Sequence, residues 1–235
     1  MASATVLKAL DALRAGRFVL VYDADGREEE TDMVIASEHV TSDAVRTMRK
    51  DAGGLICTTT DSTIQEALGL PFLAELFKDM GARFPVMNEL IPNDIPYDVK
   101  SAFGITINHR KTFTGITDRD RSLTIKEFSK LAAEAVGKED GWGKRELGKS
   151  FRAPGHVHLL NASRKILETR FGHTELSTAL VIMAGLVPSA TVCEMMGDDG
   201  NALPKSGAYA YAERNGLVFL EGAEIISSWK ESQKG

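Results

Sequence analysis

A dense run of acidic side chains, from Asp23 to Asp32, is the first feature of the sequence that could do chemistry. Six of its ten residues are Asp or Glu, and it directly follows the short apolar run Phe18 to Tyr22. Carboxylates at the end of a buried strand repel one another unless a cation or a basic substrate group compensates them. The spacing is not that of an EF-hand, because Glu28 stands where that loop needs glycine. A divalent metal site and a solvated acidic loop are both open interpretations.

A second group of functional side chains surrounds the expected start of an amphipathic helix, in the segment Arg170 to Glu175, RFGHTE. Gly172 permits close approach of the backbone, and Thr174 is suited to capping the helix. The free N–H groups of the first turn attract an anion, and the planar guanidinium of Arg170 fits a phosphate. An ordinary capped helix with a surface histidine is the alternative.

Two further polar side chains stand out against their surroundings. His156 follows Pro154-Gly155 at the expected start of a strand, and Glu194 lies inside the apolar strand pattern of residues 190–195. A carboxylate in such a strand is rarely structural unless it is paired. We therefore treat both as candidate functional residues.

One motif match is set aside. Residues Gly143 to Ser150 satisfy G-x-x-x-x-G-K-S, the pattern of the phosphate loop in nucleotide triphosphatases. That loop needs an apolar strand before it and a helix after it, so that several backbone N–H groups point at the phosphates. Here the preceding residues are charged and rich in glycine, and Pro154-Gly155 follows within a few residues. We assign no nucleotide site to this segment.

The elements that must position these side chains alternate irregularly, without a repeat or a linker. Hydrophobic periodicity predicts helices over 4–15, 42–52, 61–68, 72–78, 174–185 and 208–214, and one after a Thr124/Glu127 capping box that reaches Val136. It predicts strands over 18–22, 55–60, 103–108, 157–160, 190–195 and 217–220, and a strand or strand-to-helix passage over 33–38. We expect a loop over 87–98 and an exposed excursion over 137–150. This pattern indicates an α+β fold, a three-layer α/β/α sandwich around a mixed twisted sheet, in a single domain.

Composition and charge exclude several classes of protein. The 235 residues are 43% hydrophobic and 26% charged, which is typical of a globular domain rather than a disordered chain. The net charge of −5 argues against a general nucleic-acid or anionic-membrane surface. No apolar run reaches the ~20 residues of a spanning helix, and two cysteines, Cys57 and Cys193, are too few for a disulfide framework. We expect a cytoplasmic protein with neither a nucleic-acid nor a membrane partner.

Taken together, the segments resemble the 3,4-dihydroxy-2-butanone 4-phosphate synthase family. REEETD (27–32), GLIC (54–57), TGIT with DRDR (114–121), PGHV (154–157), RFGHTE (170–175) and CE with DDG (193–200) follow the order and approximate spacing of that family. The resemblance extends from Phe18 to about Glu221. Thr31 stands where the family has glycine, and segment 137–150 is longer than in bacterial members, both of which resemble archaeal-type variation. No cyclohydrolase domain follows, so we expect a monofunctional chain, with residues 1–235 forming one synthase domain.

The resemblance implies a lyase of riboflavin biosynthesis that converts D-ribulose 5-phosphate to 3,4-dihydroxy-2-butanone 4-phosphate and formate. The implied steps are enolisation, loss of water, a skeletal rearrangement and expulsion of C4. Such chemistry needs acid and base groups on both faces of the sugar and a Lewis acid at its oxygens. The implied cofactor is Mg²⁺ or Mn²⁺, two ions per site, and the implied assembly is a homodimer with its sites near the interface.

The resemblance also implies roles for individual residues. Glu28 and His173 are metal ligands that lie at the substrate, and Arg27 and Asp32 contact it. The phosphate is cradled by the segment that contains Arg170, Phe171, Gly172, His173 and Thr174. His156 and Glu194 transfer protons, and Glu194 also contacts the substrate. The remaining candidate catalytic positions are Asp23 and Glu30, which shape the acidic loop, and Cys57, which lines the pocket and is not expected to be a nucleophile.

Two other functions compete with the lyase. A metal-dependent phosphosugar isomerase or epimerase would share the enediol step and the phosphate site, but would release no formate. A non-catalytic phosphosugar-binding module would be expected to have lost an acid or base residue. The sequence retains Glu28, His156, His173 and Glu194, which favours the lyase.

Overall fold

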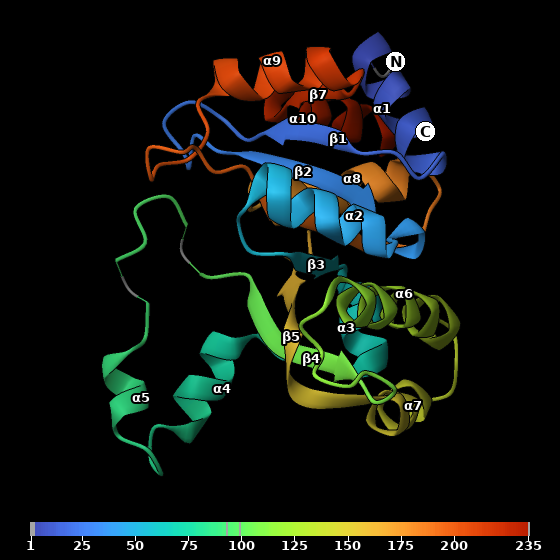
Figure 1. Cartoon of the computed structure of the whole chain (residues 1–235). Coiled ribbons are helices and arrows are strands. Elements are labelled where there is room, and N and C mark those ends of the chain that lie inside the picture. Colours follow the sequence, from blue (N-terminus) through green and yellow to red (C-terminus); the bar gives the residue numbers. More distant parts are fainter. Residues whose placement is uncertain (1–2, 93, 99, 235) are drawn as a thin grey trace.

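A seven-stranded mixed sheet, in the order β4-β5-β3-β6-β2-β1-β7, runs through the molecule (Figure 1). The computed structural model describes residues 3–92, 94–98 and 100–234. The strands are β1 (Val19–Tyr22), β2 (Thr31–Ala36), β3 (Cys57–Thr60), β4 (Phe103–His109), β5 (Phe151–Asn161), β6 (Ala190–Glu194) and β7 (Val218–Glu221). Strands β1 and β7, and β3 and β5, pair in parallel, whereas the other neighbours are antiparallel.

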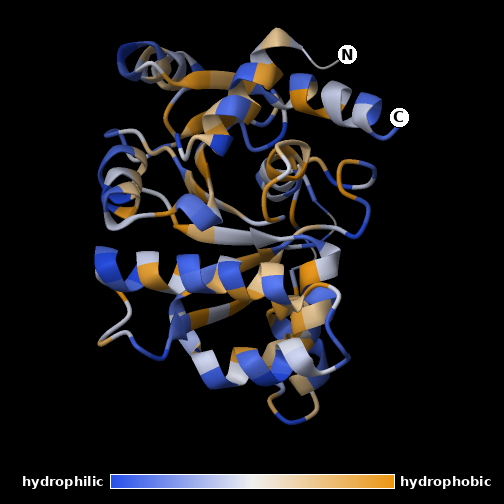
Figure 2. Cartoon of the chain, turned by 90° about the vertical axis from the view of Figure 1, so that its right-hand side faces the viewer, coloured by the Kyte–Doolittle hydropathy of each residue, from blue (hydrophilic) through white to orange (hydrophobic). Residues whose placement is uncertain are grey.

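Helices cover both faces of this sheet. One face packs against α1 (Ala4–Arg14), α8 (His173–Met183) and α10 (Gly222–Ser232). The other packs against α2 (Ser42–Thr47), α3 (Ser62–Leu68), α6 (Asp118–Ala135), α7 (Trp142–Ser150) and α9 (Lys205–Asn215). The two hydrophobic cores lie between these layers, and Figure 2 shows apolar residues on the strands with polar residues on outward helix faces. The predicted α+β fold with three layers is confirmed.

Short helical segments complete the chain. A 3-10 turn, η1 (Ser37–His39), follows β2, and a π-helical turn, η2 (Met48–Ala52), ends the helix that begins with α2. Helices α4 (Leu73–Met80) and α5 (Val86–Glu89) contain no buried residue and project as an arm from the body of the molecule (Figure 1). The expected loop over 87–98 therefore begins with the end of α5.

Local sequence signals explain where most elements begin. Helix α1 starts after Ser3, whose hydroxyl accepts a hydrogen bond from the Val6 N–H at 3.2 Å. Its buried residues recur at helical spacing, as the apolar pattern predicted. All four residues of β1 are buried, as expected of a strand with helices on both faces.

The predicted capping box of the long helix is wrong. Helix α6 begins at Asp118, seven residues before the expected start, and its cap is Thr117, whose hydroxyl accepts from the Asp120 N–H at 3.1 Å. Thr124 is fully buried inside the helix, where its hydroxyl accepts from the His109 N–H at 3.0 Å. Thr117 and Thr124 are each followed by an acidic residue three positions later, so both resemble the start of a helix. The hydroxyl of Thr124 bonds to β4 instead of capping the helix.

The prediction of an exposed excursion over 137–150 is wrong for its second half, because residues 142–150 form α7. Trp142 and Leu147 pack against the core, and Gly143 lies so close to Ala67 of α3 that a Cβ would meet its carbonyl oxygen. The phosphate-loop match lies inside this helix, so the segment forms no phosphate loop.

Two further elements differ from the prediction. Helix α10 was not anticipated. Strand β5 is longer than predicted, with Pro154 and Gly155 inside it rather than in a preceding turn.

The sheet order brings separate parts of the sequence together at one end of its central strands. In the β2–β6 register, Asp32 is the Cα partner of Glu194, and in the β3–β6 register Cys57 is the partner of Val192. The acidic loop of residues 23–30 connects β1 to β2 at this end. The sheet topology therefore brings the acidic segment, Cys57 and Glu194 close together, although no local sequence signal predicts that they meet.

The packing of α1 gives a matched stability test. Leu13 is fully buried, whereas Leu7 in the same helix is 52% exposed. We expect Leu13→Ala to lower the free energy of unfolding by about 2–5 kcal/mol, because it removes buried apolar area and leaves a cavity. Leu7→Ala should change it by less than about 0.5 kcal/mol. Urea unfolding followed by circular dichroism measures both, and equal effects would contradict the assigned orientation of α1.

Candidate active site

A cavity of about 510 Å³ opens where the central strands end. Several separate segments line it: the acidic loop with the start of β2, the segment that leads into β4, strands β3, β5 and β6, and the start of α8 with the residues before it. Among the sequence-predicted residues, those that line it are Arg27, Glu28, Glu30, Asp32, Cys57, Arg170, His173, Thr174 and Glu194. The structure thus brings most of the predicted site residues into one space.

Asp23 shapes the acidic loop and is not a lining residue. Its side chain is buried, and its carboxylate accepts hydrogen bonds from the Glu28 N–H at 3.0 Å and the Glu30 N–H at 3.2 Å. Arg27 Nη1 donates to the same carboxylate at 3.1 Å. The loop returns through Glu29, which has a positive φ of 57°. Asp23 therefore fixes the positions from which Glu28 and Glu30 reach the cavity.

Glu28 and His173 form a nearly buried ion pair. His173 Nδ1 lies 3.1 Å from Glu28 Oε2, and its Nε2 lies 3.2 Å from the Glu30 carbonyl oxygen. Burial alone would raise the pKa of Glu28, but His173 and Arg27 outweigh it and lower this pKa to about 2. Burial alone would lower the pKa of His173, but Asp32, Glu28 and Asp23 raise it to about 9. In the metal-free protein both partners are therefore charged at neutral pH.

Asp32 is a buried carboxyl group without a hydrogen bond. Its Oδ1 has no hydrogen-bond partner among the described residues, and it lies 3.7 Å from His173 Nε2. Burial, together with the charges of Glu194, Glu28 and Glu30, raises the pKa of Asp32 to about 7, although His173 opposes this. Burial and the charges of Glu28 and Glu194 likewise raise the pKa of Glu30. A carboxyl group with a pKa near 7 can both donate and accept a proton at neutral pH.

The residues fit a divalent metal ion. Asp23, Glu28 and His173 each offer a ligand atom, and the three atoms lie within 4.8 Å of one another. The oxygens of Asp23 already accept the loop hydrogen bonds, which leaves Glu28 and His173 as the pair that faces the cavity. A carboxylate and an imidazole suit Mg²⁺ or Mn²⁺ with further oxygens from water or substrate. Asp32 Oδ1 lies beside them and has no hydrogen-bond partner among the described residues, as expected of an oxygen that binds a cation or carries a proton.

The start of α8 forms the basic side of the site. Thr174 was expected to cap this helix, but Gly172 is the N-cap residue and no side chain satisfies the first N–H groups. The guanidiniums of Arg27 and Arg170 converge on Gly172, where an added Cβ would lie 2.6 Å from a nitrogen of each. Arg170 Nη1 donates to the fully buried Glu175 at 2.5 Å, whereas its buried Nε has no partner among the described residues. Phe171 is 41% exposed and lines a neighbouring cavity rather than this one.

The β3–β6 pair contributes Cys57 and Glu194. Cys57 is buried, and burial with the charges of Glu194 and Asp32 raises the pKa of its thiol well above the usual value. A thiol that stays protonated is a poor nucleophile. Glu194 Oε2 accepts a hydrogen bond from the Leu55 N–H at 2.7 Å, which orients the carboxylate toward the cavity.

Comparison with known proteins identifies the family of this chain. The family model described as 3,4-dihydroxy-2-butanone 4-phosphate synthase matches residues 7–228.

The chain belongs to this family.

Similar proteins include the 3,4-dihydroxy-2-butanone 4-phosphate synthase of Methanothermobacter thermautotrophicus, 48% identical over 96% of this chain and 96% of that protein. The synthase of Methanosarcina mazei is 45% identical over 94% of this chain and 90% of its own length. A crystal structure of a 3,4-dihydroxy-2-butanone 4-phosphate synthase in complex with two magnesium ions superposes with a TM-score of 0.76, at 26% identity, over 97% of each chain. The chain is therefore an enzyme of riboflavin biosynthesis, a lyase with the fold of these synthases.

His156 is a further expected site residue that does not line the cavity. His156 is exposed on β5, where its Nδ1 lies 3.1 Å from Asn108 Nδ2 and its N–H donates to Asn108 Oδ1 at 2.8 Å. Because an amide nitrogen only donates, the ring accepts at Nδ1 and carries its proton at Nε2 when neutral. Asn108 also donates to the Thr114 carbonyl oxygen at 3.4 Å. Asn108 therefore connects the PGHV and TGIT segments, which lie on one patch.

The segment before β4 supplies site residues that sequence reasoning missed. Ile95 to Asp98 and Ser101 to Phe103 line the cavity, and Asp98 forms ion pairs with Arg27 and Arg170. The Tyr97 ring lies 5.3 Å from the guanidinium carbon of Arg27. The sequence indicated only a proline-containing loop here, and nothing in its pattern links Asp98 to an arginine 71 residues earlier.

The Glu28–His173 pair predicts a pH dependence of stability. Because the folded-state pKa of His173 is raised from 6.5 to about 9, its contribution is present below pH 6.5 and lost as pH rises through about 9. In EDTA, the free energy of unfolding by urea should fall between about pH 7 and about pH 9, and His173→Asn should reduce this fall. His156→Asn, which changes an exposed histidine, should keep it. An undiminished fall in His173→Asn would contradict the ion pair.

Proposed function

We propose that the chain converts D-ribulose 5-phosphate to 3,4-dihydroxy-2-butanone 4-phosphate and formate, with Mg²⁺ or Mn²⁺ as cofactor and two ions per site. The observation that carries this proposal is the joining of a metal-suited pair, Glu28 and His173, with a proton-carrying carboxyl, Asp32, in one cavity. The guanidiniums of Arg27 and Arg170, which line the same cavity, suit the phosphate of the substrate. The magnesium-bound structure of a related synthase supports the choice of metal.

The basic side would bind the phosphate. Arg170 is oriented by Glu175, and its guanidinium lies beside Gly172 and the uncapped N–H groups of α8, where an anion would bind. The segment Arg170 to Thr174 would thus hold the phosphate through side-chain and backbone donors together. Arg27 would also contact the substrate at its phosphate, and Asp32, which is able to share a proton, would contact the sugar oxygens.

Glu28 and His173 would hold the metal. A bound divalent ion supplies a Lewis acid that polarises the sugar carbonyl and hydroxyl groups. Asp32 and Glu194, Cα partners on adjacent strands, would hold and move protons on one side of the sugar. Formate release separates this lyase from a phosphosugar isomerase or epimerase, and turnover of any kind separates it from a phosphosugar-binding module.

We propose further that the protein is a homodimer in which His156 of one subunit reaches the cavity of the other. Within one chain, His156 and the TGIT segment lie on an exposed patch with Phe113 94% exposed and Ile116 51% exposed. Apolar side chains this exposed beside a hydrogen-bonded histidine are typical of an interface. A second proton-transfer group would then face the sugar from the side opposite Asp32 and Glu194.

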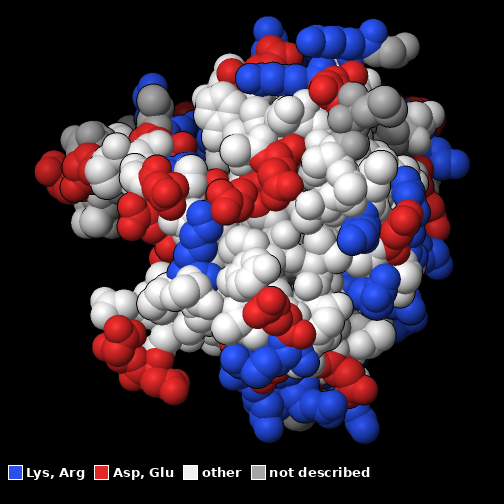
Figure 3. All heavy atoms as spheres, turned by 90° about the horizontal axis from the view of Figure 1, so that it is seen from above, with Lys and Arg blue, Asp and Glu red and all other residues white. Residues whose placement is uncertain are grey.

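The cellular setting follows from the same observations. We propose that residues 1–235 form one synthase domain that works in the cytoplasm, because both cysteines are buried and unpaired. No helix among the described residues is long and apolar enough to cross a membrane. On the face shown in Figure 3, acidic and basic side chains are interspersed over much of the surface, with a group of basic side chains at the lower edge of the view. With the net charge of −5, this supports a function without nucleic acid.

Metal removal tests the cofactor assignment. EDTA should abolish formate release from ribulose 5-phosphate without changing the circular dichroism spectrum, because the hydrophobic cores do not depend on the ion. Mg²⁺ or Mn²⁺ should restore activity. Glu28→Gln and His173→Ala should not recover at any added metal concentration, whereas Glu29→Gln, a neighbouring exposed carboxylate, should behave as wild type. Full activity in EDTA, with no ion retained, would refute this assignment.

Mixing two inactive variants tests the shared site. His156→Ala and Glu194→Gln should each lose about 10²–10⁴-fold in turnover, because each removes one positioned acid or base. If His156 acts across the interface, subunit exchange between the two variants rebuilds one intact site per mixed dimer. Random exchange should then return about a quarter of wild-type activity. No recovery, despite exchange demonstrated by differently tagged chains, would place both groups in the same subunit.

A further inference from the structure

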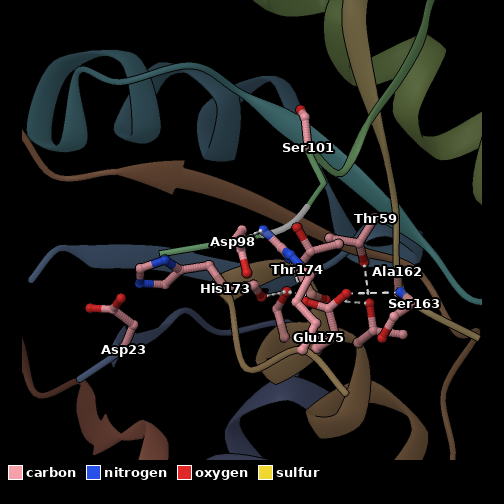
Figure 4. Close-up of polar contacts among 12 residues, drawn as sticks. Asp23, Thr59, Asp98, Ser101, Ala162, Ser163, His173, Thr174 and Glu175 are labelled. Carbon is pink, nitrogen blue, oxygen red and sulfur yellow. Dashed lines mark hydrogen bonds and ion pairs between the residues drawn. The ribbon is translucent and has the colours of Figure 1, made fainter. Parts of the chain in front are cut away.

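Asp98 occupies the position where the basic side of the site would hold an anion. A single oxygen, Oδ2, accepts from Arg27 Nη2 at 2.7 Å and from Arg170 Nη2 at 2.6 Å. The Asp98 side chain is only 10% exposed. Figure 4 shows it in the same part of the site as His173, Thr174 and Glu175, at the start of α8. An oxygen between two guanidiniums has the surroundings of a phosphate oxygen.

Neither arginine depends on Asp98 for its position. Arg27 is held by Asp23 at 3.1 Å and by Glu28 at 2.9 Å, both from its own loop. Arg170 is held by Glu175, whose other oxygen accepts from the Ser163 N–H at 2.8 Å (Figure 4). Asp98 is therefore a third carboxylate brought from a different segment to arginines that are already fixed.

The charge of the site disfavours a phosphate while Asp98 is in place. Arg27, Arg170 and His173 face the carboxylates of the acidic loop, β2, β6 and α8, so that negative charge already exceeds positive charge. A phosphate monoester dianion would share its two guanidiniums with the ionised Asp98 at contact distance, where like charges repel strongly. Asp98 also lines both the 510 Å³ cavity and an adjoining one of about 870 Å³ that contains Lys100 and Arg164. The side chain has space to turn away.

We propose that Asp98 is an intramolecular stand-in for the substrate's phosphate, which competes with a phosphate monoester for Arg27 and Arg170 and so sets the affinity for it. The inference rests on the proposed function in that the anion is the phosphate of a sugar phosphate. It makes Asp98 a specificity-determining residue, because an uncharged sugar cannot displace it. A monoanion gains less than a dianion from taking its place.

Binding of inorganic phosphate to the metal-free protein tests the competition without requiring catalysis. Calorimetric titration in EDTA should show that Asp98→Asn binds phosphate about tenfold more tightly than wild type, because an amide leaves both guanidiniums to the ligand. Asp94→Asn removes the same charge from an exposed position four residues earlier and should leave the affinity unchanged. Arg170→Ala should abolish binding, which shows that the probe occupies this site. Circular dichroism and thermal unfolding verify that each variant is folded.

The metal-loaded enzyme gives a second readout. Asp98→Asn should lower KM for ribulose 5-phosphate with a smaller change in kcat, and should lower the inhibition constant of phosphate in parallel. Unchanged or weaker phosphate binding in Asp98→Asn would overturn the inference and make Asp98 a support for the arginines. An equal gain in Asp94→Asn would also overturn it, since the effect would then be one of net charge. Absence of formate in wild type would refute the proposed function, while the phosphate titration would still decide the role of Asp98.

Discussion

Carboxylates held close together away from water repel one another, and the functional end of this sheet is organised by that repulsion. Asp23, Glu28 and Glu30 come from the acidic loop, Asp32 from β2 and Glu194 from β6, and the neighbouring cationic side chains include Arg27, Arg170 and His173. The repulsion is relieved in different ways at different positions: Glu28 pairs with His173 and stays ionised, whereas Asp32 is pushed toward protonation. One cluster therefore contains both a metal-suited carboxylate and a proton-carrying one, the division of roles that a metal-dependent lyase requires.

The sheet order is what makes this crowding possible. Strand β2 lies beside β6, and β6 beside β3, so that residues far apart in sequence face one cavity. Helix α8 then approaches from one side with its uncapped first turn, which adds His173 and the anion-binding N–H groups at once. Further lining residues come from the segment that leads into β4 and from β5.

The sequence predicted the chemistry of this site better than its geometry. An acidic run after a buried strand, and RFGHTE before an apolar helix, carry local physical signals, so both segments were recognisable as candidate sites. Only the family resemblance singled out Glu28 and His173 within them. The start of α6 was not, because Thr117 and Thr124 offer similar caps and only the contact of Thr124 with His109 separates them. Residues 142–150 formed a helix because Trp142 and Leu147 find apolar partners on the core, which no local window contains. Asp98 contacts its arginines only through tertiary folding, and His156 lies on an exposed patch outside the cavity.

The three hydrogen bonds that Asp23 accepts have a thermodynamic consequence. They fix the loop that carries Glu28 before any ligand is present, and Glu29 holds its left-handed conformation within that same framework. Little backbone entropy is then left to lose when an ion arrives, so the free energy of binding is not spent on ordering the loop. The enthalpy and entropy of metal binding would mainly report the release of water and of the His173 proton. Because the loop is ordered during folding, its rigidity increases the affinity for the ion.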